Sequence, residues 1–171
     1  THARKRFMWL LFLMLSATVT GTIITRYENA FSAVPLLVSF IPMLMDTGGN
    51  CGSQSSTLII RGIALGEIQF SDLFRVMFKE FRVSLIVGVA LALANGIRIL
   101  IMYKNAGLAL VIGLSLVATI VISKLIGCVL PLIAKKLHMD PAIMASPLIT
   151  TLVDTCSILI YFNIATQVFQ L

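Results

Sequence analysis

The chain has 171 residues, of which 58% are hydrophobic and 12% are charged, and its mean hydropathy is +1.01. This composition is too apolar for a soluble domain of that size and predicts an all-α integral membrane protein. The length allows about five spans of roughly 20 to 25 residues and excludes a separate soluble catalytic domain. The formal net charge is +6, but the basic residues stand at the ends of apolar runs, which argues against nucleic-acid binding.

The first predicted span covers about residues 7–25 and follows a basic run, Arg4 to Arg6. Basic residues beside a span stay on the cytoplasmic side, so the N-terminus is expected in the cytoplasm. Further along the chain, basic residues gather in the predicted inner loops, whereas Arg26 and Lys104 are expected outside. This asymmetry predicts a multi-pass protein of the cell membrane, with the N-terminus inside and the C-terminus outside.

The second predicted span, about residues 33–60, turns from apolar to polar near its middle. The polar part, DTGGNCGSQSST, starts at Asp46, and an apolar run follows it. Polar or irregular backbone at membrane depth must line a cavity or be buried in protein. An ordinary Gly-rich loop is the alternative, but it would leave the span unusually short. We therefore predict an irregular break from Gly48 to Gln54 that lines an ion pathway, with amide oxygens from Asn50 and Gln54.

Three further elements are expected before the last span. Phenylalanines at helical spacing predict a short amphipathic helix at the cytoplasmic interface, about residues 70–81. The third span is predicted at about residues 83–103 and the fourth at about 106–134. The fourth span contains one deep charge, Lys124, which either snorkels to the inner interface or pairs with an acid inside the bundle. Snorkelling is the interpretation that we favour.

The last predicted span, about residues 141–163, carries an acid, Asp154, well inside an apolar run. An ionisable group at that depth is rare unless it faces a bundle interior or a water-filled cavity. Ser146, Thr150 and Asp154 follow at four-residue steps, which places their oxygen atoms on one helix face. A helix interface held together by hydroxyls would explain the serine and threonine but not the aspartate. This face is therefore predicted to be a functional site.

A single subunit with five spans is a thin wall for a pore. A symmetric homodimer would solve this problem by placing the Asp154 faces of two subunits around a two-fold axis. The predicted fold is thus five transmembrane helices per subunit, with a pore at the homodimer interface.

Two motifs occur in order along the chain: Pro42 with Gly48-Gly49-Asn50-x-Gly52-x-Gln54, and Asp140-Pro141 with Pro147-Leu148 and Asp154. Together they resemble the transmembrane domain of the MgtE family of magnesium channels, over essentially the whole chain. The resemblance implies a five-span subunit, a homodimer with a central pathway for Mg²⁺, and Asp154 as the cation-binding acid. Family members usually carry cytosolic N-terminal and CBS domains that sense Mg²⁺ and close the pore. Neither is present here, so we expect them in the full-length chain, of which this sequence would be a trimmed piece.

Magnesium demands octahedral oxygen coordination and loses water reluctantly, so a pathway for it should be wide and lined with oxygen atoms. The candidate metal-contacting residues all offer oxygen: Asp154, Thr150, Ser146, Asp46, Asn50 and Gln54. Further residues belong to the motifs as structural positions: Gly48, Gly49, Gly52, Pro42 and Pro147. Ser146 stands where some family members have Asn. We expect Mg²⁺ as the transported ion, no cofactor, and the lipid bilayer and a second copy as partners.

Two other function classes compete with a channel. Asp46-Thr47-Gly48 matches the short signature of aspartic proteases, and Asp154 would be the second acid of an intramembrane aspartyl protease. Against this, the predicted spans place the two acids roughly 10 Å apart along the membrane normal. A purely structural membrane scaffold leaves Asp154 unexplained. We therefore predict a transporter rather than an enzyme.

Overall fold

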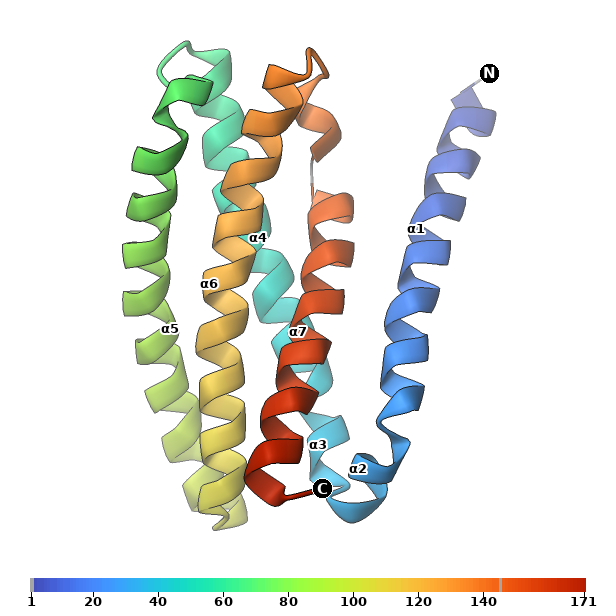
Figure 1. Ribbon diagram of the computed structural model, residues 1–171, viewed down its shortest axis with the longest axis vertical. Coiled ribbons are helices and arrows are strands. Elements are labelled where there is room, and N and C mark those ends of the chain that lie inside the picture. Colours follow the sequence, from blue (N-terminus) through green and yellow to red (C-terminus); the bar gives the residue numbers. More distant parts are fainter. Residues whose placement is uncertain (1, 145) are drawn as a thin grey trace.

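A computed structural model describes residues 2–144 and 146–171, and no strand occurs among them. The elements in chain order are α1 (His2–Arg26), α2 (Glu28–Ala33), α3 (Leu36–Ser39), α4 (Ile41–Ala64), η1 (Phe70–Asp72), α5 (Leu73–Tyr103), α6 (Ala106–Lys136), η2 (Pro141–Met144) and α7 (Ser146–Phe169). The predicted all-α class is confirmed. Figure 1 shows α4, α5, α6 and α7 running side by side as a bundle, with α1 along one side of it.

The helix α6 occupies the centre of this arrangement. It packs against α5, α4 and α7, while α4 and α7 also pack against each other and α1 contacts α7. The N-terminus and the C-terminus lie at opposite ends of the molecule (Figure 1).

Within the described part of the chain, four helices are long and apolar enough to cross a membrane: His2–Arg26, Phe70–Tyr103, Ala106–Lys136 and Pro147–Phe169. The helix α4 does not belong to this group, although its 24 residues correspond to roughly 36 Å at 1.5 Å per residue. Its polar middle lowers its mean hydropathy, yet it packs against both α6 and α7. The structure therefore packs a helix of membrane-spanning length with a polar middle against the apolar helices α6 and α7.

The predicted irregular break between residues 48 and 54 is wrong, because α4 continues through this stretch without interruption. The glycines serve close helix packing instead. A β-carbon on Gly48 would lie 2.7 Å from Cγ2 of Thr119, and one on Gly49 would lie 2.9 Å from Cγ2 of Thr150. Small residues of this kind allow neighbouring helices in a membrane to approach each other closely.

The chain bends before α4 rather than within it. The short helix α3 ends at Ser39, and α4 starts at Ile41 with Pro42 in its first turn. Proline is tolerated there because the first N–H groups of a helix have no intrahelical partner. The second long helix thus covers Ile41–Ala64 instead of the predicted 33–60.

The structure also differs from the predicted separate interfacial helix at about residues 70–81. The turn η1 leads directly into α5, which then continues to Tyr103. A capping box starts this segment: the backbone N–H of Gln69 donates to the Asp72 carboxylate at 3.0 Å, and the Gln69 side chain caps the turn in return. With its start fixed at this point, the helix runs through the polar segment into the apolar one.

The two ends of the bundle have separate buried clusters. At one end, α3, α4, α6 and α7 meet around fully buried Leu37, Leu44, Ile112, Tyr161 and Phe162. At the other end, the cluster consists of Ile59, Ile63, Cys128 and Leu132. Between these two clusters, the polar middle of α4 packs against the part of α7 that contains Thr150 and Val153.

Candidate ion site on α4 and α7

One face of α4 is polar and exposed. Asp46, Asn50 and Gln54 follow at four-residue steps along it and are all exposed. Residues at this spacing lie one above the other on a helix. The opposite side of α4, which includes Cys51 and Ser55, is buried. The structure therefore brings the three predicted residues of this helix onto a single open face.

The helix α7 contributes Thr150 and Asp154, both half-buried. The hydroxyl groups of Thr150 and Thr151 donate to the carbonyl oxygen of Pro147 at 3.0 and 2.9 Å. Because each hydroxyl hydrogen points back along the helix, the oxygen lone pairs stay available to accept hydrogen bonds. The side chain of Ser146, the fourth predicted residue of this helix, lies outside the described part of the structure.

Close contacts fix the register between α4 and α7. A β-carbon on Gly48 would lie 2.8 Å from Cγ1 of Val153, and one on Gly52 would lie 2.7 Å from Cγ2 of Ile149. As residue numbers rise along α4 they fall along α7, so the two helices are antiparallel. In this register Asp154 lies at the level of the turn of α4 that contains Asp46.

This register corrects the predicted depths of the two acids. A span starting at residue 33 would place Asp46 about four turns into the membrane, but α4 starts only at Ile41. The predicted separation of roughly 10 Å between Asp46 and Asp154 along the membrane normal is therefore wrong. Both acids lie at one level of the bundle, where their negative potentials add.

Neither acid has a charged partner within the described part of the chain. Among the described residues, no ion pair or hydrogen bond involves the carboxylate of Asp46 or Asp154. The described residues also include no group of three or more His, Cys, Asp or Glu side chains that could hold a metal ion. The described part of the chain thus presents oxygen atoms and carboxylates without a paired cation, but not a closed coordination shell.

The favoured interpretation of Lys124, snorkelling, is wrong, and the alternative, pairing with an acid inside the bundle, is confirmed, with a partner that the sequence did not identify. Lys124 does not snorkel: it is buried, and its Nζ atom lies 3.6 Å from Oε2 of Glu80 on α5. The sequence did contain a signal for this pairing. Glu80, Ser84 and Gly88 follow at four-residue steps, so in one continuous helix from Leu73 to Tyr103 they lie on the same side, and all three are buried. The predicted separate interfacial helix hid that signal.

Comparison with known proteins relates this site to a family. The sequence profile of the MgtE family, described as "Divalent cation transporter", matches residues 41–164. The chain belongs to the MgtE family. The matched region contains every candidate residue of α4 and α7, and only α1 to α3 and the last residues of the chain lie outside it.

Three relatives are each named "Magnesium transporter MgtE". The Bacillus subtilis protein is 40% identical over 164 residues, which is 96% of this chain and 36% of the relative. The Thermus thermophilus protein is 37% identical over 161 residues, or 94% of this chain and 35% of the relative. The Enterococcus faecalis protein is 35% identical over 165 residues, or 96% of this chain and 36% of the relative.

The names of these relatives agree with the predicted transporter and not with the aspartyl protease alternative at Asp46 and Asp154. The chain is a membrane protein, as its composition predicted. It spans about a third of the length of the relatives that it matches.

Proposed function

We propose that this chain is the transmembrane part of a magnesium transporter in which two copies enclose a pathway for hydrated Mg²⁺. The observation that carries the proposal is the open polar face of α4, with Asp154 at the level of Asp46 and its carboxylate without an ion-pair or hydrogen-bond partner among the described residues. The names of the MgtE relatives supply the ion, and the chemistry of the face agrees with it. Hydroxyl, amide and carboxylate oxygens are the ligands of a hard cation such as Mg²⁺.

In this proposal α4 also crosses the membrane, which brings the number of spans to five when it is added to the four apolar helices. Its back packs so tightly on α6 that a β-carbon on Gly127 would overlap the carbonyl oxygen of Gly52. Its front, with Asp46, Asn50 and Gln54, is exposed in the single subunit. Such a front cannot face lipid, because a polar group in hydrocarbon has no water to satisfy it. A second copy related by a two-fold axis would cover the face and leave a hydrated pathway between the subunits.

The acids bind the ion mainly by charge. Two Asp154 carboxylates facing each other across the axis would repel, and one divalent cation neutralises both. Magnesium keeps most of its first water shell, so these waters donate hydrogen bonds to the carboxylates and to the threonine and amide oxygens. The site must hold the ion firmly enough to admit it and weakly enough to release it. Thr150 and Ser146 would accept the ion's waters as it moves toward the cytoplasm.

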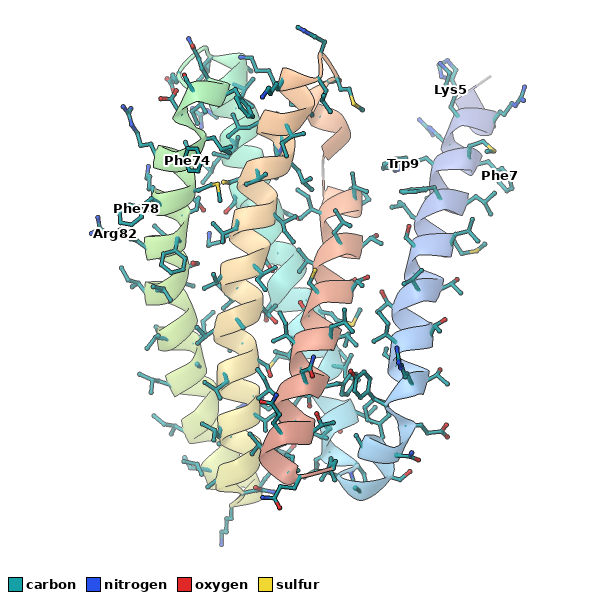
Figure 2. The ribbon with its side chains drawn as sticks, viewed as in Figure 1. Lys5, Phe7, Trp9, Phe74, Phe78 and Arg82 are labelled. Atoms are coloured by element: carbon teal, nitrogen blue, oxygen red, sulfur yellow. The ribbon has the colours of Figure 1, made fainter. Side chains whose placement is uncertain are left out.

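The orientation in the membrane follows from the residues at one end of the bundle. Figure 2 shows Lys5, Phe7 and Trp9 of α1 toward the same end as Phe74, Phe78 and Arg82 of α5. Aromatic residues collect at the membrane–water interface, and basic residues collect on its cytoplasmic side. We infer that this end is cytoplasmic, with the N-terminus inside and the C-terminus outside. Cytosolic regulatory domains of the CBS type are expected in the full-length protein.

Replacing Asp154 tests the proposal. Asp154→Asn keeps the size of the side chain and removes its charge, so it should strongly reduce both Mg²⁺ uptake into proteoliposomes and thermal stabilisation of the dimer by Mg²⁺. Asp154→Glu should retain part of both. The matched control is Glu28→Gln, which also removes one carboxylate charge, at an exposed residue of α2 that lies outside the family-matched residues 41–164. Uptake at the wild-type rate in Asp154→Asn would rule the mechanism out.

A further inference from the structure

A buried polar network connects three helices behind the candidate ion face. Its members are Ser55 of α4, Glu80 of α5 and Lys124 of α6, which are 0%, 8% and 5% exposed. The Ser55 hydroxyl donates to Oε2 of Glu80 at 2.6 Å and accepts from Nζ of Lys124 at 3.4 Å. The ammonium group of Lys124 lies 3.6 Å from the same carboxylate oxygen. The proposed transport mechanism uses none of these groups.

The network acts on the side of α4 that faces away from the ion. Successive residues of an α-helix are about 100° apart, so Ser55 lies roughly half a turn around the axis from Asp46. Asp46 is exposed and Ser55 is fully buried, as this geometry requires. The charged pair therefore belongs to α5 and α6, and in the described part of the structure it is hydrogen-bonded to α4 through the Ser55 hydroxyl.

The charges make this contact directional. A lysine and a glutamate removed from water stabilise a bundle only if they are paired and hydrogen-bonded, and loss of one partner leaves an uncompensated charge. A serine hydroxyl both donates and accepts, so it can bridge the two charges, whereas an apolar side chain cannot. Rotation of α4 would break both bonds of Ser55 at once. Apolar packing of the same surface is not directional, so it would not select one rotational setting of α4 in this way.

We propose that Ser55, Glu80 and Lys124 form a positioning clamp that sets the rotation of α4 about its own axis. This rotational setting places Asp46, Asn50 and Gln54 on the side of α4 that faces the proposed ion pathway. Its effect on transport rests on the function proposed above, but the rotational setting of α4 does not. The two are therefore tested by separate measurements on the same variants.

The thiol of Cys51 reports the rotation. Cys51 lies one turn from Ser55 on the buried side of α4 and is 8% exposed. With Cys128, Cys156 and any cysteine outside this chain replaced by alanine, N-ethylmaleimide modifies only this thiol in the full-length dimer. We expect slow modification in the parent protein, and a rate about tenfold higher in Ser55→Ala and in Lys124→Met, because α4 opens more readily without the clamp. Lys79→Met is the matched control, since Lys79 is exposed one residue from Glu80 on α5.

Exchanging the two charges should restore the slow modification of Cys51 that single substitutions lose. Glu80→Lys combined with Lys124→Glu rebuilds the pair in the opposite direction, and the Ser55 hydroxyl can still donate to one group and accept from the other. This double variant should return the Cys51 rate close to that of the parent, whereas each of its single substitutions should not. If Lys124→Met does not fold, Ser55→Ala still tests the clamp, because it removes one hydroxyl group and no charge.

Measurements of magnesium uptake distinguish a role of the clamp in positioning α4 from a role in protein stability alone. In Ser55→Ala we expect a raised apparent KM for Mg²⁺ together with the faster Cys51 modification, and neither change in Lys79→Met. Variants that lose thermal stability but keep the parent Cys51 rate and KM would overturn the proposal. A different outcome would separate the two proposals: the parent protein takes up no Mg²⁺, yet the variants still show faster modification of Cys51. That outcome would support the clamp and contradict the transport function.

Discussion

Gly127 of α6 faces Gly52 of α4 at a point where the two helix backbones touch. A β-carbon on Gly127 would overlap the carbonyl oxygen of Gly52, and one on Gly52 would lie 3.2 Å from the carbonyl oxygen of Ser123. Backbone atoms cannot move aside as the end of a flexible side chain can. The contact therefore sets how close the polar helix α4 lies to the centre of the bundle.

Gly127→Ala should destabilise the protein by about 1 to 3 kcal/mol, the usual cost of forcing extra atoms into a packed core. The measurement is the free energy of unfolding in a denaturing detergent. Gly96→Ala on α5 is the control, because nothing lies within 4 Å of a β-carbon at that position. This control should be neutral or slightly stabilising, since glycine inside a helix costs roughly 0.5 to 1 kcal/mol relative to alanine. Equal stability of the two variants would contradict the close contact.

Gly49→Val should abolish Mg²⁺ uptake while the dimer stays folded. The reason differs from the predicted break in the helix: a β-carbon at Gly49 would lie 2.9 Å from Cγ2 of Thr150, so a larger residue pushes away the part of α7 that leads to Asp154. Dimer content by size-exclusion chromatography and uptake into proteoliposomes are measured together. Gly96→Val serves as the control on a helix outside the site. Normal uptake in Gly49→Val would show that this contact does not position α7.

Cysteine labelling tests the proposed orientation. Single cysteines at Asn29 and Asn105, in a background without the native cysteines, should react with a membrane-impermeant thiol reagent added outside intact cells. His138→Cys should react only after the membrane is permeabilised, because the loop after α6 is expected in the cytoplasm. Labelling of His138→Cys from outside would reverse the orientation.

Tyr161→Phe should reduce stability by about 1 kcal/mol, the net value of a typical buried hydrogen bond. The Tyr161 hydroxyl is fully buried and donates to the carbonyl oxygen of Leu37 at 2.6 Å, which ties α7 to α3. Tyr103→Phe is the matched control, since Tyr103 is 38% exposed. Uptake of Mg²⁺ should be similar in both variants, and identical unfolding free energies would argue against the bond.

The sequence by itself determined the class, the family and the polar residues of the candidate site. Composition and apolar periodicity are local properties, and a polar, glycine-rich stretch beside apolar runs is visible without any knowledge of packing. The four-residue spacing of Asp46, Asn50 and Gln54 is also visible in the sequence, but it becomes a shared face only because α4 is a continuous helix, where an irregular break was predicted.

Only the tertiary structure decided how these pieces combine. Whether glycines break a helix or allow it to pack closely depends on the neighbouring helix, and at Gly48 and Gly49 the neighbours are side chains of α6 and α7. The common level of Asp46 and Asp154 follows from the antiparallel register of two helices far apart in the sequence. The pairing of Glu80 with Lys124 likewise required α5 and α6 to lie side by side. Such contacts depend on side chains brought together by folding, and no local pattern along the chain contains that information.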